Sequence, residues 1–104
     1  MKIVRLAPEA LVEVEEAAGW YESRRSGLAA EFLDEFERML PVLAERPRSF
    51  PRLLDPAPEL ELRRALLPRF PYALVFLELP EEIRIVAVAH VRRRPGYWLN
   101  RLKP

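Results

Sequence analysis

Two amphipathic helical segments, separated by only two residues, constrain the fold of this chain more than any other feature. Residues 8–25 and 28–45 both repeat apolar side chains at helical spacing, the pattern of helices that pack one face on a core. Ser26 and Gly27 interrupt the pattern. Two such helices with so short a break form an antiparallel hairpin. In the first segment the predicted core positions are Leu11, Val14, Ala18 and Tyr21.

The second segment contains a proline at an unfavourable place. Its predicted core positions are Phe32, Phe36, Met39, Leu40 and Leu43. Pro41 lies among them and has no backbone N–H to donate, and its ring collides with the preceding turn of a helix. We therefore expect a kink near residue 38, or an early end followed by a second short helix.

The remaining segments read as strands. Their apolar, β-branched and aromatic residues predict strands at residues 2–6, 61–67, 72–79 and 83–91. Proline-rich residues 46–58 are expected to form a connecting loop, residues 79–82 a tight hairpin, and residues 97–102 one or two helical turns. The order β-α-α-β-β-β predicts a single α+β domain over residues 1–104, with the helical hairpin on one face of a mostly antiparallel sheet. The other sheet face is expected to be partly open.

Composition excludes several classes of site. The chain has no cysteine and one histidine, which excludes disulfides, a thiol nucleophile, a zinc–thiolate site and a histidine-rich metal site. No second histidine is present to activate a serine. We predict no metal and no cofactor. The apolar runs are too short to span a membrane and the N-terminus lacks a signal peptide, so we expect a soluble cytoplasmic protein.

Charge is distributed unevenly along the chain. Residues 1–45 carry 5 basic and 10 acidic side chains, whereas residues 46–104 carry 12 basic and 6 acidic ones. Fifteen of the 17 basic residues are arginine, whose planar fork suits phosphate and carboxylate. The second half is therefore expected to meet an anionic partner, unless the arginines reflect compositional bias alone. The densest basic stretch contains Arg92, Arg93, Arg94, Arg101 and Lys103.

Several residues near the C-terminus could carry chemistry. His90 could transfer a proton, or it could be a hydrogen-bonded structural residue. Arginines interleaved with Tyr97 and Trp98 suit single-stranded nucleic acid, although the two rings could instead pack the tail on the sheet. We interpret the helical acids as solvated surface, namely Glu13, Glu16, Glu31, Asp34 and Glu35.

These motifs together resemble the RelE/ParE superfamily of toxins from type II toxin–antitoxin modules, often called plasmid stabilisation proteins. The resemblance covers nearly the whole chain. It rests on Leu62-Arg63-Arg64, Phe70-Pro71-Tyr72, Val75-Phe76, Ala87-Val88-Ala89-His90, Arg92-Arg93-Arg94-Pro95 and Tyr97-Trp98 with Arg101, and upstream on Phe32, Phe36, Pro47, Phe50 and Pro51.

The resemblance implies a growth-inhibiting toxin that is neutralised by a small, acidic, partly disordered antitoxin in a hetero-oligomer. An antitoxin helix could lie along the helical hairpin, and an extended acidic stretch over the arginine face. The RelE-like branch cleaves mRNA on the ribosome, with basic residues on the strands and a tail tyrosine. For that activity the candidate catalytic residues are Arg64, His90, Arg93 and Tyr97. Candidates for binding the target or the antitoxin are Arg63, Arg92, Arg94, Trp98 and Arg101.

Two positions depart from the RelE-like pattern. Ala73 stands where that branch typically has an arginine, and Leu66 stands where a second cation would point the same way as Arg64. Cleavage needs these charges, so the departures favour the ParE-like branch, whose target is DNA gyrase. The alternatives are a ribosome-dependent endoribonuclease, or a toxin fold that has lost its activity and serves as an antitoxin partner or repressor component. Whether Arg63 or Arg64 faces the open sheet surface stays open, because a register error of one residue exchanges them.

Overall fold

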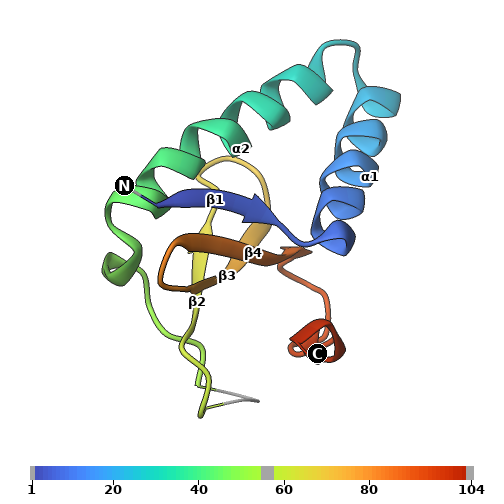
Figure 1. The fold of residues 1–104 in the computed structure, drawn as a ribbon. Coiled ribbons are helices and arrows are strands. Elements are labelled where there is room, and N and C mark those ends of the chain that lie inside the picture. Colours follow the sequence, from blue (N-terminus) through green and yellow to red (C-terminus); the bar gives the residue numbers. More distant parts are fainter. Residues whose placement is uncertain (1, 55–57, 103–104) are drawn as a thin grey trace.

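The computed structural model describes residues 2–54 and 58–102, with two helices against a four-stranded sheet (Figure 1). Lys103, and residues 55–57 of the expected loop 46–58, lie outside the described residues. The order of elements confirms the predicted β-α-α-β-β-β domain. The elements are β1 (Ile3–Leu6), α1 (Pro8–Arg24), α2 (Leu28–Glu45), the 3-10 turn η1 (Pro47–Ser49), β2 (Leu62–Leu66), β3 (Tyr72–Glu78), β4 (Glu82–His90) and the 3-10 turn η2 (Leu99–Leu102).

The sheet has the strand order β1-β4-β3-β2. Strands β2, β3 and β4 form an antiparallel meander, as consecutive strands with short connections do, and β1 pairs in parallel with β4. The Leu79 N–H donates to the Glu82 carbonyl at 2.8 Å and closes the tight hairpin expected at this place. The mostly antiparallel sheet predicted from the sequence is therefore confirmed.

The break between the helices depends on one glycine. Gly27 has φ of +89°, a left-handed conformation that side chains rarely adopt, and it turns the chain sharply before α2. The Glu22 carboxylate, from the last turns of α1, accepts the N–H groups of Gly27 and Ala29. It satisfies donors at the start of α2 that have no partner inside that helix. The hairpin is thus stabilised by contacts local in the sequence.

Two details of the helices differ from the sequence prediction. Helix α2 continues past Pro41 to Glu45, so the expected early end is wrong. The buried stripe of α1 includes Ala10 and Ala17, whereas Leu11 is 50% exposed. Small alanines occupy the positions closest to the sheet, and hydrophobicity alone pointed to the larger neighbouring leucine.

Each sheet face has its own apolar cluster. The main core lies between the helices and the sheet and includes Phe32, Phe76, Ile83, Ile85 and Val88. A smaller cluster covers the opposite face, where the C-terminal segment and the loop before β2 close over the strands. Its buried members are Leu62, Val75, Val86, Ala87 and Trp98.

A bulge in β4 determines which residues face the helices. Val75 pairs with Ala87 but Phe76 pairs with Ile85, so Val86 is an extra residue in β4. Consequently Val86 and Ala87 both belong to the smaller cluster, although alternation would place them on opposite faces. The bulge shifts the alternation of the last residues of β4, so that Val88 returns to the helix side.

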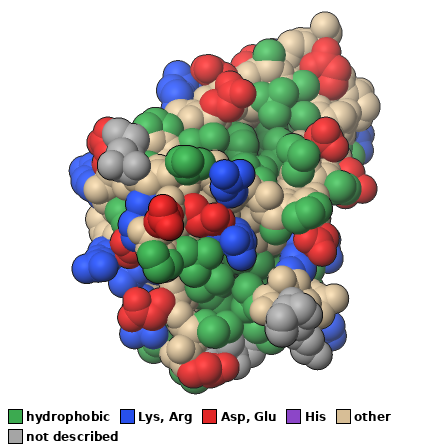
Figure 2. Space-filling view, in the orientation of Figure 1, with side chains coloured by type: hydrophobic (Ala, Val, Ile, Leu, Met, Phe, Trp, Pro, Cys, Tyr) green, Lys and Arg blue, Asp and Glu red, His purple; other side chains and the backbone are tan. Residues whose placement is uncertain are grey.

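The surface is not uniformly polar. Figure 2 shows hydrophobic side chains gathered between the two helices on the face seen in Figure 1, with arginines and acidic residues around them. Among the residues that the structure describes, no helix combines the length and the apolar character needed to cross a membrane.

Candidate functional site

The register of β2 answers which arginine faces the sheet surface opposite the helices. Ala65 and Leu67 belong to the main core, whereas Leu62 belongs to the smaller cluster on the other face. By alternation Arg64 therefore lies on the face opposite the helices, and its side chain is exposed. Arg63 lies on the other side, where its guanidinium donates to the Phe50 carbonyl at 2.7 Å.

Several predicted site residues meet at one small cavity on the open sheet face, which we call the arginine pocket. It has a volume of about 80 Å³, and Ala73, Val75 and Ala89 are among its apolar lining residues. Arg63, Arg92 and Arg101 are not among the lining residues. The predicted residues that line it are Arg64, His90, Arg93, Arg94, Tyr97 and Trp98.

The arginine pocket carries positive charge that no carboxylate among the described residues neutralises. Within the described residues, no carboxylate forms an ion pair with Arg64, Arg93 or Arg94, and the same holds for the neighbouring Arg92. All four side chains are exposed. This concentration of free guanidinium groups suits a phosphate or carboxylate partner.

Tyr97 and Arg101 belong to a half-buried polar cluster centred on Glu13 of α1. The Arg101 guanidinium donates to both Glu13 oxygens, at 2.9 Å each, and the Tyr97 hydroxyl donates to Glu13 Oε2 at 2.6 Å. The Glu13 and Arg101 side chains are only 12% and 13% exposed. The cluster joins the C-terminal segment to α1, a connection between residues 84 and 88 positions apart.

The same cluster caps the free edge of β4. Strand β1 ends at Leu6, opposite Ile85, so beyond this point β4 has no strand on that side. The Val88 N–H donates to Glu13 Oε1 at 2.9 Å, and Arg101 Nη1 donates to the Val86 carbonyl at 3.1 Å. A buried backbone group without a partner would be costly, so these side chains replace the missing strand.

The cluster fixes the protonation of its members. Burial opposes ionisation of Glu13, but the hydrogen bonds from Arg101, Tyr97 and the Val88 N–H outweigh it and lower the pKa of this carboxyl below its usual value. Burial, together with the hydrogen bond to Glu13 and its charge, strongly raises the pKa of the Tyr97 hydroxyl. Tyr97 is therefore a bound hydrogen-bond donor at neutral pH and a poor proton acceptor.

Two acidic residues have environments that differ from the sequence interpretation, and Trp98 adopts one of the two alternatives that the sequence left open. Glu13 and Glu35 were expected to be solvated, but Glu35 is 5% exposed and holds the Arg69 N–H and guanidinium at 2.8 and 2.9 Å. Trp98 is 3% exposed, so its ring packs on the sheet and offers no free face to a partner. The interpretation of Glu13 and Glu35 as solvated surface is wrong, because tertiary contacts cover both side chains.

Sequence reasoning missed Glu13 as part of the site. Its neighbours one helical turn away include Ala10 and Ala17, which let α1 approach β4 closely. A glutamate between small buried residues is a weak signal for a buried acid, and no pattern in the sequence pairs it with Arg101.

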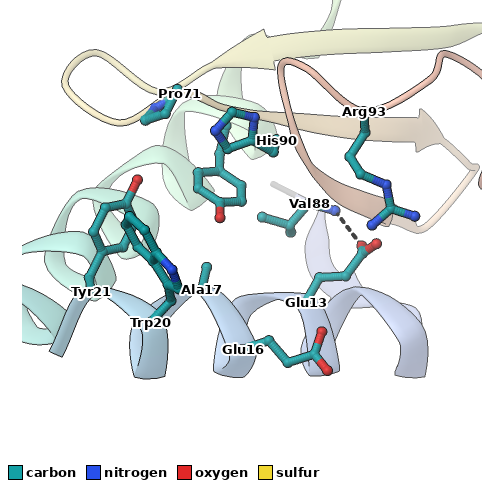
Figure 3. A pocket seen from close by; sticks show the side chains of 10 residues that line it. Glu13, Glu16, Ala17, Trp20, Tyr21, Pro71, Val88, His90 and Arg93 are labelled. Atoms are coloured by element: carbon teal, nitrogen blue, oxygen red, sulfur yellow. Dashed lines mark hydrogen bonds between the residues drawn. The ribbon is translucent and has the colours of Figure 1, made fainter. Parts of the chain in front are cut away.

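A second, larger hollow lies on the other side of His90, between α1 and the end of β4, and we call it the helix cleft (Figure 3). Its volume is about 510 Å³. His90 and Arg93 line both this cleft and the arginine pocket. The other lining residues are Glu13, Glu16, Ala17, Trp20, Tyr21, Pro71, Tyr72 and Val88.

Comparison with known proteins identifies the fold. Neither a protein-family model nor a curated protein sequence matches this chain. Among solved structures, a chain of the "Chromosomal ParDE TA system from P. aeruginosa" matches with a TM-score of 0.73, covering 86% of this chain and 96% of that chain. This is a RelE/ParE-like fold. At 15% identity the likeness concerns the fold, and it confirms the architecture that the sequence motifs predict.

Proposed function

We propose that this chain is the toxin component of a type II toxin–antitoxin module and that it acts in the ParE-like manner, by binding DNA gyrase. The observation that carries the proposal is the RelE/ParE-like fold, shared over nearly the full length of both chains with a chain of a ParDE system. The motifs Phe70-Pro71-Tyr72 and Arg92-Arg93-Arg94-Pro95 independently support the same assignment.

The geometry of the arginine pocket supports binding over cleavage. RNA cleavage needs a base for the 2′-OH, cations for the phosphate and an acid for the leaving oxygen. Tyr97 is held by Glu13 at 2.6 Å, and Arg64 has Ala73 and Leu66 as its neighbours along the open face. Exposed guanidinium groups beside an apolar floor suit a protein surface with carboxylates.

Two surfaces support an antitoxin as partner. The exposed arginines Arg64, Arg92, Arg93 and Arg94 suit an extended acidic stretch, and the apolar surface between α1 and α2 suits one face of an amphipathic helix (Figure 2). A disordered acidic chain could reach both surfaces and order on binding. The proposed complex is a toxin–antitoxin hetero-oligomer in the cytoplasm.

Induced expression in a bacterial host without the antitoxin tests the toxin assignment. We expect growth arrest that co-expression of the antitoxin relieves, and we expect a small acidic reading frame next to this gene to encode that antitoxin. Purified protein should inhibit DNA supercoiling by gyrase. Growth that continues normally would contradict the toxin proposal and support the inactive repressor component, while unchanged supercoiling would contradict gyrase as the target.

Single substitutions test the site. Arg64→Ala and Arg93→Ala should each relieve growth arrest, because each removes an unneutralised cation from the arginine pocket. Arg38→Ala is the matched control, since Arg38 is an exposed arginine on α2 that pairs with Asp34 at 3.2 Å and does not line the arginine pocket. If neither pocket variant relieves arrest, the arginine pocket is not the surface that acts on the target.

A ribosome-dependent mRNA endoribonuclease is the second candidate, favoured by one observation. Arg64, His90 and Arg93 line a single cavity, so two cations and a group able to transfer protons lie together. A translating-ribosome assay separates the candidates. Cleaved mRNA that disappears in His90→Ala would support this alternative, and intact mRNA during growth arrest would exclude it.

A further inference from the structure

The helix cleft contains a set of hydrogen-bond donors that the protein itself does not use. Within the described residues, the hydroxyls of Tyr21 and Tyr72, the Trp20 indole N–H and the Arg93 guanidinium donate no hydrogen bond, and the two hydroxyls are open to solvent because no buried side-chain atom lacks a partner. The Arg93 guanidinium lies over the Tyr97 ring, 3.8 Å from its centroid, with its N–H groups unused. His90 Nδ1 accepts the Arg92 N–H at 3.1 Å, so the proton of the neutral ring is on Nε2, a further donor. Donors without partners around one cavity indicate a ligand rich in acceptors.

Both tyrosines keep their protons under ordinary conditions. Burial, with the neighbouring Tyr72, raises the pKa of the Tyr21 hydroxyl, and burial, with the charge of Glu13, raises that of Tyr72. Both groups are therefore donors at neutral pH. An anionic oxygen is the acceptor that gains most from such donors and from the neighbouring Arg93.

The cleft also has an aromatic wall. Trp20 and Tyr21 meet edge to face, with ring centroids 5.1 Å apart, and Trp20 is 52% exposed. In Figure 3 these two rings stand at one end of the cleft and Arg93 at the other, with His90 between them. Tyr21 is 9% exposed, and the Arg24 guanidinium lies over one face of Trp20, 4.6 Å from the ring centroid. A planar ring would therefore bury apolar surface mainly against the face of Trp20 that Arg24 leaves open.

The two carboxylates that line the cleft differ in whether their oxygens are free to accept hydrogen bonds from a ligand. Both Glu13 oxygens are occupied by Arg101, Tyr97 and the Val88 N–H. Glu16 forms no ion pair or side-chain hydrogen bond within the described residues and can accept N–H groups from a ligand. A simple cation would be repelled by Arg93, and a purely apolar group would leave the donors without partners.

We propose that the helix cleft binds a nucleoside monophosphate, with its base against Trp20 and Tyr21 and its phosphate among Tyr72, His90 and Arg93. Glu16 accepts N–H groups from the edge of the base, which favours guanine because it presents adjacent N–H donors to one carboxylate. The cleft volume of about 510 Å³ accommodates one nucleotide. This inference does not depend on whether the chain is a toxin.

Tryptophan fluorescence of the purified protein tests the proposal with GMP as probe. We expect GMP to quench the emission of exposed Trp20, whereas buried Trp98 stays unaffected, so that Trp20→Phe abolishes the response. Guanosine and inorganic phosphate should each bind at least about tenfold more weakly than GMP, because each lacks one half of the contacts. Equal binding of either fragment, or no quenching by GMP, would overturn the proposal.

Three substitutions locate the site. Arg93→Gln should weaken GMP binding by about tenfold or more, and Tyr72→Phe and Glu16→Gln by severalfold, through loss of hydrogen bonds to charged groups. The matched control is Arg84→Gln, an exposed arginine on β4 that pairs with Glu82 and does not line the cleft. Unchanged affinity in all three cleft variants would contradict the location.

The nucleotide could be free or the end of an RNA strand, and a guanine-containing tetranucleotide distinguishes these sources. We expect GMP to bind at least as tightly as the tetranucleotide, since the cleft holds one base. A tetranucleotide that binds about tenfold more tightly would overturn the free nucleotide as ligand and assign the site to a strand.

Discussion

Glu13 contacts three separate parts of the molecule through one carboxylate. It accepts hydrogen bonds from the Val88 backbone, from the Tyr97 hydroxyl and from both ends of the Arg101 guanidinium. Because the pair is mostly desolvated, removal of either charge leaves the other buried without a partner. Glu13 thus positions Tyr97 and Arg101 beside the arginine pocket without itself lining that pocket.

Glu13→Gln should lower the free energy of unfolding by about 2 kcal/mol, because the amide replaces charged hydrogen bonds with weaker ones and leaves Arg101 without a counter-charge. Urea denaturation at neutral pH measures the change. Glu16→Gln on the same helix is the control, since Glu16 is exposed and forms no ion pair within the described residues, and it should change stability by less than about 0.5 kcal/mol. Equal effects of both substitutions would contradict the role of Glu13.

The stability of the fold should also fall in acid through Glu13. Its pKa in the folded protein is lowered, so its contribution is fully present above the pKa of an unfolded glutamate and is lost as pH falls through the folded value. Urea midpoints measured from neutral pH down through this range should fall more steeply for the unmodified protein than for Glu13→Gln. Parallel curves for the two proteins would show that other carboxylates, such as Glu35 and Glu78, account for the acid sensitivity.

At the scale of elements, the bulge in β4 and the C-terminal segment act together. The extra residue Val86 turns two consecutive side chains toward the smaller cluster, where Trp98 covers them. The same displacement leaves the Val86 carbonyl free for Arg101. The segment around η2 therefore packs on the sheet and hydrogen-bonds to β4. Its own helical turn is too short to be stable alone.

Trp98→Ala should destabilise the protein by about 3–5 kcal/mol, because it removes a large buried ring and leaves a cavity against the sheet. Thermal or urea denaturation measures the loss. Trp20→Ala provides the comparison, since Trp20 is half exposed, and it should cost less than about 1 kcal/mol. A small effect of Trp98→Ala would mean that the C-terminal segment contributes little to the fold.

In the molecule as a whole, the uneven distribution of charge along the chain becomes an uneven distribution of charge over the surface. Many carboxylates of the first half pair with arginines nearby in space, such as Arg25 with Glu31 and Arg69 with Glu35. Of the arginines that follow β4, Arg101 pairs with Glu13, whereas Arg92, Arg93 and Arg94 form no ion pair within the described residues. One region of the surface therefore keeps a positive potential that can attract an acidic partner from a distance.

Binding of the proposed acidic antitoxin should consequently depend on ionic strength. We expect the affinity to fall by about tenfold or more between about 0.05 M and about 0.5 M salt, since screening weakens exposed charge pairs. Titration of the purified pair measures the slope, which Arg64→Gln and Arg94→Gln should reduce and Arg38→Gln should not. An affinity independent of salt would indicate that the apolar surface between the helices carries the binding.

The helical hairpin, the strands and their order could be predicted from the sequence, because they follow from local periodicity, from Gly27 and from the prolines of the loops. The sequence also placed the basic residues in the region where the arginine pocket forms. Its errors at Leu11, Glu13 and Glu35 share one cause, since burial depends on neighbours far away in the chain.

Which side chains form ion pairs or hydrogen bonds, and which stay unpaired, became visible in the tertiary structure alone. The pairing of Glu13 with Arg101 spans 88 positions, and the bulge at Val86 is visible only as a change of register against β3. The choice of Arg64 over Arg63 for the open face likewise follows from strand pairing. Contacts of this kind are set by how the elements pack, which local sequence patterns do not encode.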